Sequence, residues 1–128
     1  MPMEIPHILV AEDDADTREL IELVLRRAGF QVTSTGDPYA VLELLATDSI
    51  DALLLDNWMP TLNGIELCRL IRSINNDVAI VFCSGAVAES DKRDAFAAGA
   101  QGFIGKPFLP QELTATLSCA LNIHVATK

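Results

Sequence analysis

The sequence predicts one α/β domain built on a doubly wound parallel sheet of five strands. Five short apolar runs, at 7–11, 30–34, 51–56, 78–84 and 102–105, alternate along the chain with five segments of helical periodicity. Runs rich in Val, Ile and Leu are apolar on both faces, as the strands of a covered parallel sheet must be. Right-handed crossovers then place helices on both faces of that sheet. A chain of 128 residues, half of them hydrophobic, has enough length for one core and not for two.

The helical segments are marked by apolar spacing and by start and stop signals. The first is expected to end at Gly29, and the second to begin with Asp37 as N-cap and Pro38 at its first position. The third helix is expected from an apolar stripe at Ile65, Cys68, Ile71 and Ile74. The fourth is expected from near Ser90 to Gly99. The fifth is expected to begin at Pro110 and to bury Leu113, Leu117, Ala120 and Leu121.

Composition excludes several classes of function. With 18 acidic against nine basic residues, the net charge of −9 disfavours direct contact with nucleic acid or an anionic membrane surface. No segment approaches the roughly 20 apolar residues of a membrane span, and the N-terminal "MPMEIPH" has no basic start. Cys68, Cys83 and Cys119 are odd in number and lie in apolar surroundings, which indicates core residues of a reducing compartment. We therefore expect a cytoplasmic protein without disulfides.

Polar residues end four of the five apolar runs. Glu12 and Asp13 follow the first run, Asp56 ends the third, Ser84 ends the fourth and Lys106 follows the fifth. In open α/β sheets, ligands bind beyond the carboxyl ends of the strands, at the point where the strand order reverses. We expect these side chains to form a site at that rim.

Three carboxylates from two strands suit a hard cation such as Mg²⁺, which takes one or two carboxylates, waters and a phosphate oxygen. The same acids also favour the positive end of the first helix, a role we expect for Asp14 or Asp16 but not for all. No glycine-rich phosphate loop of the GxGxxG or GxxxxGK[ST] type occurs, so nucleotide binding is poorly supported.

Three rim residues can carry phosphoryl chemistry. Asp56 ends a run that is apolar on both faces, and beside a metal it can act as a nucleophile and form an aspartyl phosphate. Taken alone, it could equally cap the following turn. Lys106, an ordinary solvated lysine if isolated, can pair with Asp56 and then with the transferred oxygens. Ser84 can donate to a phosphoryl oxygen.

Together these residues strongly resemble a bacterial two-component response regulator receiver domain of the single-domain, chemotaxis-regulator type. The resemblance covers nearly the whole chain. Its motifs are Glu12–Asp13, "LLLDNWMPTLNGIEL" with Asp56, Pro60 and Gly64, Ser84 followed by Gly85, and "GAQGFIGKPF" with Lys106–Pro107.

The resemblance implies a flavodoxin-like fold of strand order 2-1-3-4-5 with Asp56 as phosphoacceptor. Asp13 and Asp56 are then carboxylate ligands of Mg²⁺, Glu12 acts largely through water, and Trp58 contributes its backbone carbonyl. Residues 1–128 are expected to form one receiver domain without an output domain.

The resemblance also implies a switch. The Ser84 hydroxyl moves to the phosphoryl group and the Phe103 ring rotates inward, which remodels the face of the fourth helix, fifth strand and fifth helix. Two departures from the family pattern, serine in place of threonine and phenylalanine in place of tyrosine, leave the amplitude of the switch open. We expect a cis Lys106–Pro107 bond, which proline makes accessible.

Three positions are expected to modulate the chemistry: Trp58, Ala86 and Pro107. Neither Trp58 nor Ala86 can orient a water for in-line attack, which predicts a long-lived phosphoryl state. The expected partners are a histidine kinase or phosphotransfer protein and an unidentified downstream protein, with the chain as a monomer or a weak phosphorylation-dependent dimer.

Two alternatives are a haloacid-dehalogenase-like phosphatase and a flavodoxin-like binding or interaction module. The first requires a second acid two residues after the nucleophile, where this chain has Trp58. A flavin binder requires a rim that tolerates a flavin phosphate, which an acidic rim repels. The retained Asp56 and Lys106 argue against an interaction module that does not depend on phosphorylation.

Overall fold

The computed structural model describes residues 5–59, 62–75, 77–85 and 88–127, and it shows the predicted parallel sheet. The strands lie in the order β2-β1-β3-β4-β5, and each neighbouring pair is parallel. The fold class and strand order are therefore confirmed. The strand bounds are β1 His7–Ala11, β2 Gln31–Thr35, β3 Ala52–Asp56, β4 Ala79–Ser84 and β5 Gly102–Gly105.

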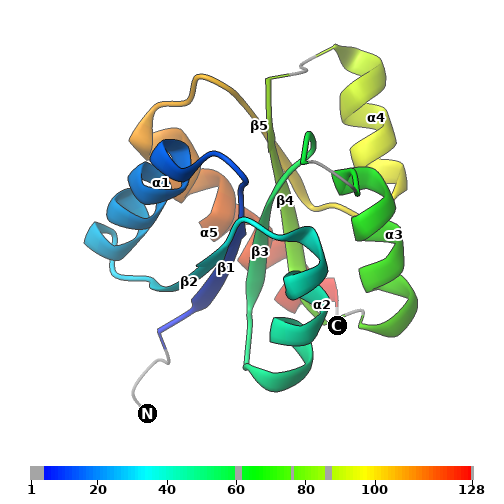
Figure 1. The fold of residues 1–128 in the computed structure, drawn as a ribbon, viewed down its shortest axis with the longest axis horizontal. Coiled ribbons are helices and arrows are strands. Elements are labelled where there is room, and N and C mark those ends of the chain that lie inside the picture. Colours follow the sequence, from blue (N-terminus) through cyan, green and yellow to red (C-terminus); the bar gives the residue numbers. More distant parts are fainter. Residues whose placement is uncertain (1–4, 60–61, 76, 86–87, 128) are drawn as a thin grey trace.

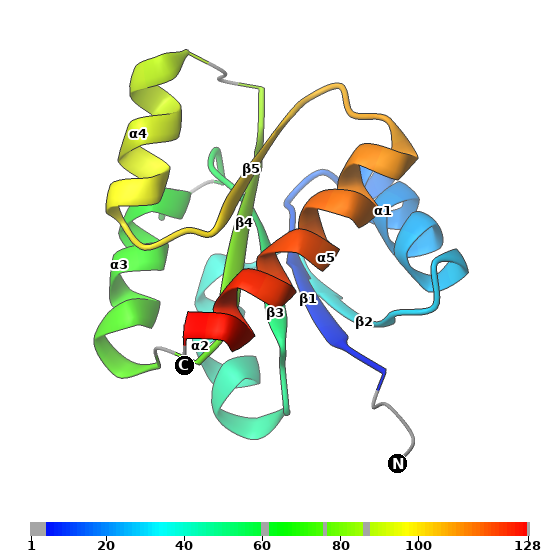
Figure 2. The same cartoon turned by 180° about the vertical axis from the view of Figure 1, so that it is seen from behind.

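Helices cover both faces of the sheet (Figure 1). Two of them, α1 and α5, pack on one face, as the reverse view shows (Figure 2), and α2, α3 and α4 pack on the other. Their bounds are α1 Ala15–Arg27, α2 Pro38–Thr47, α3 Gly64–Ile74, α4 Glu89–Ala97 and α5 Pro110–Thr127.

The central strand β3 shows why its sequence must be apolar throughout. Leu53 and Leu55 join the core beneath α2, α3 and α4, whereas Ala52 and Leu54 join the core beneath α1 and α5. All of them are buried, and full burial of a leucine is worth about 1.5–3 kcal/mol. The last residue of this buried strand is Asp56, so the fold holds a carboxylate at a fixed place beside two cores.

The helix signals in the sequence are confirmed. The Asp37 side chain accepts a hydrogen bond from the backbone N of Tyr39 at 2.9 Å, and Pro38 is the first residue of α2. Gly29 and Gly99 adopt φ values of +96° and +115° at the ends of α1 and α4. Glycine reaches this left-handed region without the steric cost that other residues meet there.

Several element boundaries differ from the predictions by one residue. Strand β2 begins at Gln31 because the Phe30 backbone N donates to Leu25 O at 3.1 Å, which makes Phe30 part of the turn that closes α1. Strands β3 and β4 likewise begin one residue later than expected, whereas α4 begins at Glu89, which agrees with the expected start near Ser90.

Two expected core residues are exposed. Ile74, the last residue of α3, is 71% exposed, and Leu67 takes a place in the buried stripe instead. Cys119 is also exposed, whereas Cys68 and Cys83 are buried as expected. Burial raises the pKa of the Cys68 thiol to about 11 and that of the Cys83 thiol to about 12.

Candidate functional site

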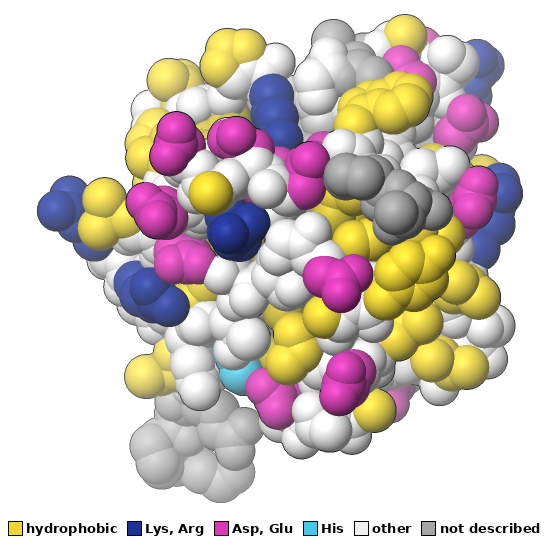
Figure 3. All heavy atoms as spheres, in the orientation of Figure 1, with side chains coloured by type: hydrophobic (Ala, Val, Ile, Leu, Met, Phe, Trp, Pro, Cys, Tyr) yellow, Lys and Arg dark blue, Asp and Glu magenta, His cyan; other side chains and the backbone are white. Residues whose placement is uncertain are grey.

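Three carboxylates converge at the carboxyl ends of β1 and β3. The side chains of Glu12, Asp13 and Asp56 each offer an oxygen, and these oxygens lie within 4.8 Å of one another. Glu12 is 2% exposed and Asp56 is 5% exposed, whereas Asp13 faces solvent. In Figure 3, acidic side chains gather over α1 and the neighbouring loops on the upper left of the molecule. The sequence correctly predicted that these acids meet at one rim.

Lys106 places one ammonium group among these acids. Its Nζ lies 2.5 Å from Glu12 Oε1 and 3.6 Å from Asp56 Oδ1. The expected pairing with Asp56 is therefore present, but Glu12 is the nearer partner. The Lys106 backbone N also donates to Ser84 O at 2.8 Å, and the Lys106–Pro107 peptide bond is cis, as predicted.

The electrostatics of the cluster leave negative charge uncompensated. Burial raises the pKa of Glu12, the charge of Asp56 raises it further, and the hydrogen bond from Lys106 opposes both without cancelling them. Burial alone would lower the pKa of Lys106, but its bond to Glu12 and the charge of Asp56 raise it overall. Lys106 is therefore protonated at neutral pH. One ammonium facing three carboxylates fits a site that also takes a divalent cation.

The Asp14 side chain caps the first helix, and its backbone N donates to Glu12 Oε2 at 3.2 Å. Its carboxylate accepts from the Thr17 backbone N at 2.9 Å and from the Thr17 hydroxyl, which makes it the N-cap of α1. These bonds lower the pKa of Asp14. The expectation that Asp14 or Asp16 supports the first helix is thus confirmed for Asp14.

The loop after Asp56 is held by the start of α3. The Gly64 backbone N donates to Asn57 O at 3.0 Å. A Cβ at Gly64 would lie 2.9 Å from both Asn57 Cα and Asp56 O, a distance that requires backbone movement. Glycine at this position therefore allows α3 to approach the candidate phosphoacceptor closely. Pro60, another motif residue, lies outside the described residues.

The remaining candidate residues lie on β4 and β5, or just after them. Ser84 is buried at the end of β4, one residue beyond Cys83, which pairs with Asp56 across the sheet. Phe103 pairs with Phe82 in the neighbouring strand and packs against the core beneath α2, α3 and α4. Ala86 lies outside the described residues, so its modulating role stays a prediction.

Trp58 faces outward. Its backbone N donates to Asp56 Oδ1 at 3.2 Å, but 64% of the residue is exposed. The indole lines a hollow between α3 and α4, together with Asn63 and Asp94. Shielding of the phosphoryl site by this side chain therefore stays a prediction.

Sequence reasoning missed two residues near the site. Arg18 Nη1 donates to Glu12 O at 2.8 Å and so fixes the backbone that carries the acids. Its position one helical turn after Asp14 was the available signal, since residues four apart share a helix face. Asn57, next to Asp56, is 7% exposed and lines the hollow beside Trp58. No sequence pattern singled out Asn57.

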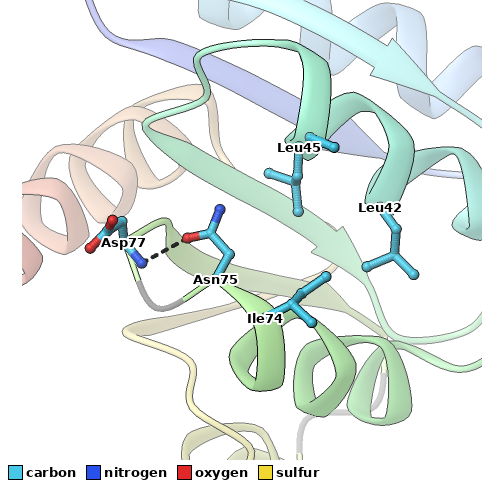
Figure 4. A pocket seen from close by; sticks show the side chains of 6 residues that line it. Leu42, Leu45, Ile74, Asn75 and Asp77 are labelled. Carbon is cyan, nitrogen blue, oxygen red and sulfur yellow. Dashed lines mark hydrogen bonds between the residues drawn. The ribbon is translucent and has the colours of Figure 1, made fainter.

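A second hollow, of about 450 Å³, lies between α2 and α3 (Figure 4). Leu42, Leu45 and Ile74 line it, and beside them the Asp77 backbone N donates to Asn75 Oδ1 at 2.8 Å. This hollow adjoins the turn that enters β4, at the amino-terminal end of that strand. The acids lie at the other end of the strands, at the carboxyl ends of β1 and β3. The hollow does not belong to the acidic site.

Comparisons with known proteins agree with this geometry. Residues 8–118 match the model of the response regulator receiver domain family. An uncharacterized transcriptional regulatory protein of Bacillus subtilis, YrkP, is 40% identical over 115 residues, which cover 90% of this chain and 49% of that protein. The response regulator MprA of Mycobacterium ulcerans is 37% identical, with coverage of 90% and 50%.

Solved structures show the same fold. A CheY-like receiver domain protein from Methanospirillum hungatei superposes with a TM-score of 0.90 at 19% identity, over 98% of this chain and all of that one. The chemotaxis protein CheY4 of Vibrio cholerae superposes with a TM-score of 0.84 at 26% identity, over 90% of this chain and 98% of that one.

The chain belongs to the response regulator receiver domain family of two-component systems. Domains of this family are phosphorylation switches and typically bind Mg²⁺. The chain spans about half the length of the curated relatives it matches. Among the described residues, no helix has both the length and the apolar character that a bilayer crossing requires.

Proposed function

We propose that Asp56 accepts a phosphoryl group from a histidine kinase or a phosphotransfer protein. The observation that carries this proposal is a nearly buried carboxylate at the end of the central strand, 3.6 Å from the Lys106 ammonium and within 4.8 Å of two further acids. Glu12, Asp13, Asp56 and the backbone carbonyl of Trp58 would hold Mg²⁺. When bound, the ion neutralises the charge that builds up on the transferred oxygens.

The transfer itself requires little beyond positioning. An Asp56 carboxylate oxygen attacks phosphorus, the bond to the donor's imidazole nitrogen breaks, and the imidazole leaves with the electron pair. Lys106 then donates to an oxygen of the new phosphoryl group, which draws its ammonium away from Glu12. The Gly64–Asn57 contact holds the nucleophile's loop during this exchange.

The proposed output is a change of the surface formed by α4, β5 and α5. Ser84 donates its hydroxyl to a phosphoryl oxygen, and the Phe103 ring turns inward behind it. Phosphorylation in this way biases a surface with two packing states, which a downstream protein partner reads. The net charge of −9 argues against direct contact of this domain with nucleic acid.

The two alternative functions fit less well. A haloacid-dehalogenase-like phosphatase requires an acid two residues after its nucleophile, and here the exposed Trp58 holds that place. A flavodoxin-like binder would have to accommodate a flavin phosphate beside three carboxylates.

The test is Mg²⁺-dependent phosphorylation by a small donor. Incubation with phosphoramidate and Mg²⁺ should add the mass of one phosphoryl group to the intact chain, and excess EDTA should prevent it. A chain that gains no mass with Mg²⁺, or gains the same mass in EDTA, would contradict the proposal.

A further inference from the structure

The hollow between α3 and α4 has features of a site for one cationic side chain. Its volume is about 250 Å³, below the roughly 300–1,000 Å³ of pockets for drug-sized ligands. It opens beside Trp58, whose indole is exposed on a chain that has no other tryptophan. An exposed indole beside a hollow of this size offers a flat apolar face to a single guest group.

Among the described residues, the charged ones that line the hollow are mostly acidic. Asp91 and Asp94 line it from α4, and Glu66 and one cation, Arg69, line it from α3. Asp91 also accepts from the Ala88 backbone N at 3.1 Å, so the start of α4 holds its carboxylate in place. Three carboxylates against one guanidinium leave the lining negative, which favours a positively charged guest.

A buried amide at the hollow is a second, independent sign of a polar guest. Asn57 is more than nine-tenths buried and lines the hollow. Its backbone carbonyl accepts from Gly64, but its side-chain amide makes no hydrogen bond to another residue in the part of the chain that the structure describes. Buried polar groups are hydrogen-bonded as a rule, so an amide in this position is suited to a ligand.

We propose that this hollow, which we call the Trp58 hollow, binds an arginine side chain of a partner protein. A guanidinium stacks on an indole, donates in its plane to several acceptors and is weakly hydrated, which sets it apart from the ammonium of lysine. It would lie against Trp58, donate to the Asn57 amide oxygen and face the α4 carboxylates.

The Trp58 hollow is also joined to the acidic site through the backbone. Asn57 and Trp58 directly follow Asp56, and the Trp58 N donates to Asp56 Oδ1. An arginine in the hollow should therefore bind with different affinity before and after phosphorylation, and the coupling acts equally in both directions. This coupling rests on the proposed function, whereas binding of the arginine does not.

The binding test uses a capped pentapeptide with a central arginine between alanines, and its citrulline counterpart, which has the same shape without the charge. Titration of the unphosphorylated protein with the arginine peptide should change the Trp58 emission saturably and shift the Asn57 side-chain amide resonances. The citrulline peptide should bind at least fivefold more weakly. Equal binding of the two peptides, or unchanged Asn57 resonances, would overturn the proposal.

Two charge-matched variants separate this site from diffuse attraction to an acidic protein. Asp94→Asn should weaken arginine-peptide binding about threefold or more, since a favourable contact between exposed charges is lost. Glu43→Gln, which removes one charge from the exposed side of α2, should leave the affinity unchanged. Equal weakening by both variants would contradict the proposal.

The coupling is tested by repeating the titration after phosphoramidate and Mg²⁺ treatment, with the added mass verified first. A changed affinity on the phosphorylated chain supports the coupling, and an unchanged affinity refutes it. Absence of added mass counts against the proposed function alone, because the binding arm needs no phosphorylation.

Discussion

Asp13→Asn should have opposite effects on stability in the absence and in the presence of Mg²⁺. The Asp13 carboxylate lies within 4.8 Å of those of Glu12 and Asp56, and at an effective dielectric of about 20 two like charges at that distance repel by roughly 3.5 kcal/mol. Because Asp13 is exposed, solvent reduces each interaction to about 0.5–1 kcal/mol. The variant also loses part of the attraction between Asp13 and Lys106. The net effect is a gain of about 1 kcal/mol in the free energy of unfolding in metal-free buffer.

For a domain of this size, such a gain corresponds to a rise in Tm of about 2–5 °C. Saturating Mg²⁺ should make wild type melt at a higher temperature than the variant. A cation at a hundred times its Kd stabilises the folded state by about 2.7 kcal/mol, and the variant should lose most of this gain along with a ligand. Wild type should therefore melt below Asp13→Asn without Mg²⁺ and above it with Mg²⁺.

Thermal unfolding followed by circular dichroism, with and without MgCl₂, measures both effects. Glu43→Gln is the control, because it removes one exposed charge from α2 and Glu43 is not one of the three clustered acids. An equal shift for Glu43→Gln would show a response to net charge alone. If Asp13→Asn gains as much stability from Mg²⁺ as wild type does, Asp13 is not a ligand.

The other predictions concern the loop after Asp56 and the thiols. Gly64→Ala should lower the free energy of unfolding by about 1–3 kcal/mol in a urea titration, because its Cβ would lie 2.9 Å from backbone atoms; unchanged stability would refute this close approach. Trp58→Asn should lose its phosphoryl group about two- to tenfold faster than wild type, as an amide can orient the attacking water; an equal or slower rate would end the shielding hypothesis. A disulfide exchange reagent at pH 8 should react quickly with Cys119 alone, since burial raises the pKa of Cys68 to about 11 and that of Cys83 to about 12; a second fast thiol in the native protein would contradict this.

The fold was predictable because its signals are local and agree with one another. Asp37–Pro38 sets the start of α2, and Gly29 and Gly99 end α1 and α4 with positive φ values. The sequence could also have predicted that Cys119 is exposed, since Leu117 and Ala120 define the buried stripe of α5 and position 119 lies off that stripe. The unexpected boundary at Phe30 depends on a closing hydrogen bond to Leu25, which no residue pattern encodes.

The meeting of the rim residues was predictable from the sequence, and their individual contacts were less so. Parallel strands bring the residues at their carboxyl ends to one edge, which is why Glu12 and Asp56 meet there. Which carboxylate lies nearest the Lys106 ammonium depends on side-chain packing, and Glu12 is the nearer one. The exposure of Trp58 is likewise a property of the folded chain, which the spacing of residues does not reveal.

The most direct test of the central claim locates the phosphoryl group itself. After treatment with phosphoramidate and Mg²⁺, borohydride reduction converts an aspartyl phosphate to homoserine, and peptide mass spectrometry then identifies the modified position. We expect homoserine at position 56, and no phosphorylation of an Asp56→Asn variant under the same conditions. Homoserine at Asp13 instead, or a variant that gains the same phosphoryl mass as wild type, would contradict it.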